Sequence, residues 1–284
     1  MLFFLVYQIG SRIALALPVR AGYAAACFLA DLKYFFSRKE RQEIIENLRL
    51  VLPGATEEEL SAHARDIFRN FSKYLVDFFR FKRMDQNYVR KQVTLSAREI
   101  VDRERARGAG SILMTAHLGN WELGGAVMGI LGYPMNVIAL DHKNKRVNKF
   151  FVNQRQMKNE RVISIGVALK KCFVALKKNE MLAILGDRDF TNHGVVVPFF
   201  GKDTLLPRGP AVFSLKTGAP IIPGFMIRHP DDHFTLSFEE PIAYQPTGDF
   251  EADVKNLTQL CGAEIERYIR KYPGQWYCFR KFWQ

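Results

Sequence analysis

Residues 111–125 read S-I-L-M-T-A-H-L-G-N-W-E-L-G-G, and they predict a strand, a turn and a helix in succession. Residues 112–116 form a short apolar run followed by turn residues, which is typical of a buried strand rather than a surface helix. Asn120 is a favourable N-cap residue, so we expect a helix over residues 121–130. His117 then lies in the turn at the carboxyl end of the strand, where open α/β sheets usually bind their ligands.

His117 and Glu122 form the first candidate catalytic pair. On one continuous helix their spacing would place the two side chains about 140° apart, because each residue turns by about 100°. A strand, turn and helix can bring them together. A carboxylate that holds an imidazole fixes its tautomer and stabilises the imidazolium formed when the histidine takes a proton. The pair is therefore a candidate general base, while Gly119 allows close backbone approach and the helix start offers N–H groups to a developing oxyanion.

Residues 117–122, H-L-G-N-W-E, resemble the His-x4-Asp/Glu motif of the glycerolipid acyltransferase superfamily. The resemblance is to the branch that contains the lipid A biosynthesis lauroyl and myristoyl transferases, to which the mycobacterial acyltransferases of phosphatidylinositol mannosides also belong. Further blocks follow in the family's order, so that the resemblance extends over roughly residues 10–284: G-D-R-D-F at 186–190, V-V-V-P-F-F-G at 195–201, P-R-G-P-A at 207–211 and P-G-Q-W at 273–276. It implies an α/β fold with a mostly parallel central sheet flanked by helices.

A second charged loop follows the apolar run 181–185, and it begins with Asp187. In a parallel sheet this loop lies at the same edge as the His117 loop. It resembles the family's Asp-x-Asp block and the acid-Arg-Asp block of the mannoside acyltransferases, where the first acid lies near the catalytic histidine. The resemblance implies that Asp187 shares or replaces the role of Glu122, although a structural Asp-Arg turn is the alternative. We assign the other polar groups of the two loops to substrate binding: Asn120, Arg188 and Asp189.

Two arginines are candidate ligands for the acyl donor. Residues 141–160 are strongly basic, which fits either a solvated helix face or a site for phosphate or an acidic carrier protein. The family has an arginine in this region that Arg155 matches best. Arg208 projects from the P-R-G-P-A loop ahead of an expected helix at 211–217, where it can hold a phosphate or the pantetheine arm of a donor.

The composition indicates a folded, cationic protein. The 284 residues are 48% hydrophobic, include 23 Phe and carry a net charge of +12. Such a chain can bury a full core, and its surface suits anionic membranes, acidic carrier proteins or nucleic acid, but no segment resembles a nucleic-acid-binding module. The four cysteines lack C-x-x-C or zinc-site spacing, so we interpret them as reduced structural thiols of a cytosol-facing protein.

Residues 1–36 form an apolar region that is interrupted by Arg12, Arg20 and Asp31. These charges leave no run of about 20 apolar residues to span a membrane, and the region lacks the pattern of a cleaved signal peptide. We expect one or two amphipathic helices on the cytosolic face of the inner membrane, followed by an acyltransferase domain at 37–284. The alternative is a pair of core helices.

Helical periodicity is clearest after the N-terminal region. Residues 38–52 predict a helix that stops at Pro-Gly, and T-E-E-E at 56–59 predicts a capping box for a second helix, whose aromatic stripe through Phe68 and Phe78 we interpret as core. The remaining predicted elements are strands at 134–140, 162–165, 221–226 and 234–238 and helices at 167–178 and 253–272. The aromatic and basic residues 276–283 fit either an interfacial anchor or a packed tail.

The resemblance implies acyl transfer from a thioester, on acyl carrier protein or coenzyme A, to a hydroxyl of a membrane glycolipid such as a lipid A precursor. His117 would deprotonate the hydroxyl, Glu122 or Asp187 would orient His117, and the alkoxide would attack the thioester directly. Backbone N–H groups after His117, with Arg155 or Arg208, would stabilise the oxyanion and the donor phosphates.

No metal or redox cofactor is required for this reaction. The chain has no G-x-S-x-G elbow and Cys172 has no evident partner, so a covalent acyl-enzyme is not supported. We expect the acyl chain beside the helix after Glu122, where Gly124, Gly125 and Gly129 leave room for it. A phosphatidylinositol mannoside or another lipid acceptor, a thioesterase reaction, and a catalytically silent lipid-binding protein are the alternatives.

Overall fold

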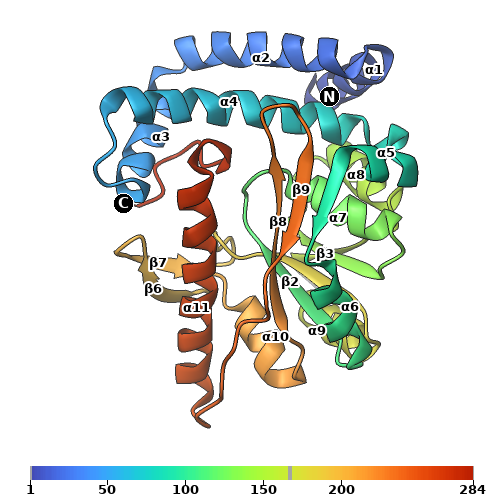
Figure 1. The fold of residues 1–284 in the computed structure, drawn as a ribbon, viewed down its shortest axis with the longest axis vertical. Helices are drawn as coiled ribbons and strands as arrows, with labels where there is room; N and C mark the ends of the chain where they lie inside the picture. The colour runs from blue at the N-terminus through green and yellow to red at the C-terminus, as the bar shows by residue number, and fades with distance from the viewer. Residues whose placement is uncertain (1, 166–167, 284) are drawn as a thin grey trace.

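The computed structural model describes residues 2–165 and 168–283, which fold around a seven-stranded sheet (Figure 1). The strand order is β1-β9-β8-β2-β5-β3-β4, and neighbouring strands are parallel except β8 and β9. The strands of this sheet are β1 Val93–Ser96, β2 Ser111–Thr115, β3 Met135–Ala139, β4 Arg161–Ser164, β5 Met181–Leu185, β8 Ile221–Arg228 and β9 Phe234–Phe238. The predicted α/β class with a mostly parallel sheet is confirmed.

Helices enclose the sheet, and a separate antiparallel hairpin of β6 (Val195–Phe199) and β7 (Lys202–Leu206) lies beside it. The helices are α1 Leu2–Ala16, α2 Val19–Phe36, α3 Arg38–Val51, α4 Glu57–Phe79, α5 Gln86–Gln92, α6 Arg98–Ala106, α7 Trp121–Ile130, α8 Lys145–Gln156, α9 Ala168–Lys177, α10 Gly209–Thr217 and α11 Phe250–Lys271. In Figure 1, α2 and α4 run side by side across one end of the strands, and α11 stands alongside β8.

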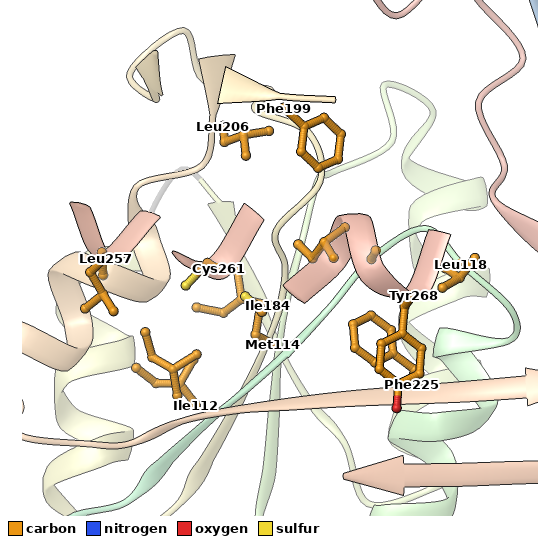
Figure 2. Close-up of a cluster of buried hydrophobic side chains, with 14 of the residues drawn as sticks. Ile112, Met114, Leu118, Ile184, Phe199, Leu206, Phe225, Leu257, Cys261 and Tyr268 are labelled. Carbon is orange, nitrogen blue, oxygen red and sulfur yellow. The ribbon is translucent and has the colours of Figure 1, made fainter. Parts of the chain in front are cut away.

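Side chains of β2 alternate between two apolar layers, because successive residues of a strand point to opposite faces. Ile112 and Met114 pack in the layer under α11 and the β6–β7 hairpin, which Figure 2 shows around Tyr268 and Cys261. Leu113 packs in the opposite layer, under α7 and α8. The central strand is therefore buried on both faces, as its unbroken apolar sequence predicts.

The chain leaves β2 and returns beside it through β5, a strand that comes later in the sequence. Helix α7 leads from β2 to β3, α8 leads to β4, and α9 then brings the chain back so that β5 inserts between β3 and β2. The register pairs Thr115 of β2 with Leu185 of β5. Because both strands point the same way, the residues two positions beyond each strand end, His117 and Asp187, meet at one edge of the sheet.

Most elements lie where the sequence predicts them. The helix at 121–130 coincides with α7, and the capping box is present, with Glu59 N donating to Thr56 Oγ1 at 3.2 Å and Thr56 N donating to Glu59 Oε2 at 2.8 Å. Val167, the predicted start of α9, lies outside the described residues. The sequence did not reveal β1, α5, α6 or β7. β1 is a four-residue strand at the edge of the sheet, paired with β9, and local periodicity carries little signal over so short a strand.

The N-terminal helices α1 and α2 cover α4 with one face and leave large apolar side chains uncovered on the other. Tyr23 and Ala30 are buried, whereas Phe35 and Phe36 at the end of α2 are 70% and 77% exposed. Further exposed apolar residues of these helices are Leu5, Val6, Ile9, Ile13, Val19, Phe28, Leu29 and Leu32. Within the described part of the chain, no helix has both the length and the apolar content to cross a bilayer. The membrane association of residues 1–36 stays a prediction.

The C-terminal residues form a packed tail rather than a free anchor. Trp276 and Trp283 are buried in the layer that contains α11, and the Asn47 side chain on α3 donates to Arg280 O at 2.8 Å and accepts from Phe282 N at 2.9 Å. Of the two alternatives, the structure shows the packed tail. The aromatic stripe of α4 is core as predicted, since Phe68 and Phe78 are buried.

Candidate active site

His117 and Asp187 form a hydrogen-bonded dyad at the carboxyl ends of β2 and β5. Asp187 Oδ1 accepts from His117 Nδ1 at 2.8 Å and from the backbone N of the same residue at 3.1 Å. The other carboxylate oxygen accepts from Trp276 Nε1 at 3.2 Å. A proton on Nδ1 leaves Nε2 with a free lone pair, so the imidazole is prepared to accept a proton at Nε2.

Asp187 is held in its ionised form despite full burial. Burial alone would raise the pKa of this carboxyl, but the facing His117 and Arg188 and the hydrogen bonds from His117 and Trp276 lower the pKa well below its usual value. Arg188 Nε lies 3.5 Å from Asp187 Oδ2, and Arg188 Nη2 donates to Tyr277 O at 2.5 Å. The carboxylate therefore carries a full charge with which to stabilise an imidazolium at His117.

Glu122, the other candidate partner of His117, pairs instead with Arg155. Arg155 Nε donates to Glu122 Oε2 at 2.9 Å and Nη2 donates to Oε1 at 2.5 Å, a bidentate pair whose side chains are 14% and 7% exposed. The reason is geometric, because the first turn of α7 directs Glu122 toward the last turn of α8. Burial would lower the pKa of Arg155, but the Glu122 carboxylate raises it above its usual value.

The four remaining candidate site residues divide into two groups. Arg188, Asp189 and Arg208 line a cavity beside the dyad, although Asp189 also accepts from Thr191 N at 3.2 Å and Arg208 also donates to Glu251 at 2.8 Å. Asn120 does not line that cavity. Its side chain caps α7 by accepting from Leu123 N at 3.1 Å and donates to Asp77 Oδ2 at 2.7 Å, so its polar atoms hold the helix start rather than a ligand.

The turn after His117 is held tightly against β8. Gly119 has φ +62°, and a Cβ there would lie 2.0 Å from Met226 O, so only glycine fits this turn. Its N–H donates to Gln275 O at 2.9 Å, and Asn120 N donates to Met226 O at 2.8 Å. These two N–H groups are thus already engaged, so the prediction of oxyanion donors is wrong for Gly119 and Asn120 and stays a prediction for the first N–H groups of α7.

The cavity beside the dyad has a volume of about 730 Å³, and its lining is mainly apolar. His117, Trp121 and Phe190 line it near the dyad. Deeper apolar contributors include Leu113, Met128, Met135, Val137, Phe151 and Phe238. An apolar cavity of this volume beside His117 can hold a hydrocarbon chain with its reactive end at the imidazole.

The glycines of α7 contribute to the cavity only in part. Gly124 and Gly125 line it, as predicted. Gly129 was predicted to leave room for the chain as well, but a Cβ there would lie 1.8 Å from Lys158 O. This glycine therefore admits the backbone of the α8–β4 turn and not a ligand.

The C-terminal P-G-Q-W-Y block supplies groups that sequence reasoning did not assign to the site. Trp276 hydrogen-bonds Asp187, Gln275 O accepts from Gly119 N, and Tyr277 N donates to His117 O at 2.9 Å. Hydrogen bonds from this C-terminal block therefore hold the His117 loop in position. Its only signal in the sequence was its match to the family's closing block.

A buried polar cluster at the start of α7 was also not identified from the sequence. Asp77 on α4 pairs with Arg228 on β8 and accepts hydrogen bonds from the Tyr23 hydroxyl and the Asn120 amide. The signal in the sequence was an acid within the apolar stripe of α4. This cluster joins α2, α4, β8 and the start of α7, and it fixes the helix that follows His117.

The burial of Cys172 disfavours its use as a nucleophile. Cys172 is fully buried in the core, and burial raises the pKa of its thiol to about 12, which disfavours the reactive thiolate. Across residues 2–165 and 168–283, no group of three or more His, Cys, Asp or Glu side chains is arranged to hold a metal ion.

A histidine–aspartate dyad beside an apolar cavity is suited to an enzyme that activates a polar nucleophile next to a hydrocarbon chain. A model of the bacterial lipid A biosynthesis acyltransferase family matches residues 1–284 of this chain. The chain therefore belongs to that family and is an acyltransferase, which confirms the resemblance drawn from the motifs.

The names of individual relatives refer to two different lipids. A phosphatidylinositol mannoside acyltransferase of Mycolicibacterium smegmatis is 24% identical over 281 residues, which cover 98% of this chain and 90% of the relative. A lipid A biosynthesis palmitoleoyltransferase of Escherichia coli is 26% identical over 265 residues, which cover 91% and 84%.

Proposed function

We propose that the protein transfers a fatty acyl chain from a thioester to a hydroxyl of a membrane glycolipid, with His117 as general base. His117 Nε2 takes the proton of the acceptor hydroxyl, the oxygen attacks the thioester carbon, and the C–S bond breaks. The departing thiolate then receives the proton from the imidazolium. The observation that carries the proposal is the His117–Asp187 dyad at the side of the apolar cavity.

The acceptor in this proposal is a glycolipid related to a lipid A precursor, with a phosphatidylinositol mannoside as the alternative. Names of relatives support both acceptors, and both are lipids with hydroxyl-bearing sugars. The identity of the sugar is a question for experiment.

An acyl carrier protein or coenzyme A is the donor that best matches the charge near the cavity. Leu140 and His142 of the β3–α8 loop line the cavity, and exposed basic residues follow them at Lys143, Lys145, Arg146 and Lys149. Both donors carry phosphate, and carrier proteins are acidic, so this basic surface favours them. Arg208, at the opposite loop of the cavity, is a further candidate for the donor phosphate.

We place the protein on the cytosolic face of the inner membrane, and the exposed apolar faces of α1 and α2 support its contact with a bilayer surface. Phe28, Phe35 and Phe36 lie exposed on α2, and Arg12 and Arg20 lie exposed near the junction of the two helices. Apolar side chains flanked by cations are suited to the surface of an anionic bilayer.

The decisive experiment incubates the purified protein with a radiolabelled dodecanoyl donor, on acyl carrier protein or coenzyme A, and a lipid A precursor or a phosphatidylinositol mannoside. Mass spectrometry of the lipids should show one added acyl chain. His117→Ala should reduce transfer by about 10² to 10⁴, the usual contribution of a general base, with an unchanged melting temperature. His63→Ala on α4, outside the cavity lining, is the matched control and should retain full transfer.

Two other results would overturn the proposal. Release of free dodecanoate without an acylated lipid would identify a thioesterase. No turnover of either donor with either lipid, by a folded protein, would favour a silent lipid-binding protein.

A further inference from the structure

One side chain in the cavity has no part in the transfer chemistry. Glu160 lines the cavity, is 2% exposed, and its Oε1 atom has no hydrogen-bond partner among the described residues. An unpaired polar atom inside a protein is costly, and such a group calls for a partner. The cavity next to Glu160 is a space from which a ligand could supply that partner.

The position of this carboxyl is set by the turn between α8 and β4. Asn159 adopts φ +60°, its amide donates to Gly129 O at 3.2 Å, and Glu160 N donates to Arg155 O at 3.3 Å. The turn packs on α7, where a Cβ at Gly125 would lie 2.9 Å from Glu160 Oε2. The carboxyl is therefore seated in space that the missing side chain of Gly125 leaves free.

The groups around Glu160 favour the uncharged form of its carboxyl. Burial raises the pKa of the Glu160 carboxyl well above its usual value, the nearby Glu122 carboxylate raises it further, and Arg155 only partly opposes them. A neutral carboxyl can donate one hydrogen bond and accept others. Arg155 is not free to neutralise it, because two of its guanidinium nitrogens bind Glu122.

Glu160 lies about one turn of α7 away from the Glu122–Arg155 pair. Gly125 follows Glu122 by three residues on α7, which is about 4.5 Å along the helix axis. The polar side of the cavity thus runs from His117 past the Glu122–Arg155 pair to Glu160, whereas most of the remaining lining is apolar. A hydrocarbon alone would offer the Glu160 carboxyl no hydrogen bond, whereas a ligand with a hydroxyl group could form one with it.

We propose that Glu160 recognises a hydroxyl group of a substrate inside the cavity. The hydroxyl can come from a hydroxylated acyl chain of the donor or from the sugar headgroup of the acceptor, since Glu160 and His117 line the same cavity. The inference rests on the proposed function in taking the cavity as the substrate site.

The test compares substrates that differ by one hydroxyl. The donor pair is dodecanoyl and 3-hydroxydodecanoyl acyl carrier protein, and the acceptor pair is a phosphatidylinositol mannoside and its monodeoxy-mannose analogues. Transfer gives kcat/KM for each compound, and calorimetry gives the Kd of each lipid and of the two free fatty acids. Wild-type protein should prefer the hydroxylated member of one pair by about 3- to 10-fold, the usual effect of one neutral hydrogen bond.

Two substitutions of Glu160 separate hydrogen bonding from packing. Glu160→Gln keeps a donor and an acceptor at the same size and should retain the preference. Glu160→Leu keeps bulk but removes both, so the hydroxylated and deoxy members should become equal within about twofold. Melting temperatures establish that each variant is folded.

Gly125→Ala tests the same site without altering Glu160. The added methyl would displace the Glu160 carboxyl and should abolish the preference. Gly124→Ala is the matched control, because its methyl would meet Met226 at 3.4 Å and Leu236 instead, and the preference should remain.

The two proposals fail in different ways. An active wild-type protein that treats both members of both pairs alike, or a folded Glu160→Leu variant that keeps the preference, would overturn the role of Glu160. Absence of transfer with every donor would count against the proposed function, and the calorimetric ratios would still decide whether Glu160 distinguishes the hydroxyl.

Discussion

The carboxylates of Glu122 and Asp187 both lie near the His117 loop, but they form hydrogen bonds with different residues. Glu122 is five positions from His117 in the sequence but binds Arg155 of α8, whereas Asp187 is 70 positions away and binds the imidazole itself. Adjacency in a motif therefore does not identify the partner of a catalytic histidine. The insertion of β5 beside β2 identifies it, because neighbouring parallel strands end at the same edge of the sheet.

Of the two carboxylates, Asp187 should cause the larger loss of kcat when it is replaced. Asp187→Asn keeps the shape but removes the charge that stabilises the imidazolium, and it permits the wrong tautomer of His117. We expect kcat to fall by about 10² to 10⁴ with KM nearly unchanged. Steady-state kinetics of Asp187→Asn and Glu122→Gln, measured in parallel, test this expectation. A greater loss of kcat in Glu122→Gln would show that Glu122, and not Asp187, supports the catalytic histidine.

Glu122→Gln should act mainly on stability. It leaves the Arg155 guanidinium buried without its counter-charge, which we expect to cost about 3 kcal/mol of unfolding free energy. The double variant Glu122→Gln, Arg155→Gln removes both charges and should recover most of that loss in urea denaturation. If the double variant is as unstable as the sum of the two single variants, the ion pair is not what couples α7 to α8.

The lowered pKa of Asp187 should make the contribution of this residue to the unfolding free energy depend on pH below 7. A carboxyl whose pKa is lower in the folded than in the unfolded chain adds stability above its unfolded pKa of about 4, and that stability is lost as the pH falls through the folded pKa. The difference in unfolding free energy between wild type and Asp187→Asn should therefore be largest near pH 7 and shrink below pH 4. Urea denaturation at several pH values measures it, and a constant difference would mean that Asp187 is not ionised in the folded protein.

Replacing the exposed aromatic residues of α2 should have a smaller effect, and it should change membrane binding rather than catalysis. Phe35→Ser with Phe36→Ser should weaken binding to vesicles of anionic phospholipid by about tenfold or more, because each exposed ring can bury apolar area in the bilayer. Vesicle flotation measures the bound fraction. Transfer to a detergent-dispersed acceptor should be preserved, so a loss there would place these residues in the catalytic fold instead.

The smallest expected effect concerns the donor. Lys145→Glu with Arg146→Glu reverses two exposed charges beside the cavity loop and should raise KM for an acyl carrier protein donor by a few-fold, roughly 3- to 10-fold at low salt. The increase should shrink as salt is added. An unchanged KM at all salt concentrations would exclude this face of α8 from donor binding.

Local signals along the chain were sufficient to predict most of the secondary structure and the family. Apolar runs marked the central strands, Asn120 marked the start of α7, and T-E-E-E marked the capping box of α4, because each of these signals lies within a few neighbouring residues. The ordered motif blocks identified the family, and they placed His117 and Asp187 among the candidate catalytic residues.

Which of these groups meet depends on the tertiary fold. The fold pairs Asp187 with His117 and Glu122 with Arg155, and it brings Trp276 to the dyad from the far end of the chain. It also engages two of the N–H groups predicted for an oxyanion, those of Gly119 and Asn120, and packs Glu160 against α7. The sequence offered both Glu122 and Asp187 as partners of His117 but could not decide between them, and it did not indicate the contacts of Arg155 and Trp276. Strand order, register and the approach of distant loops depend on packing over the whole sheet, which no window of neighbouring residues contains.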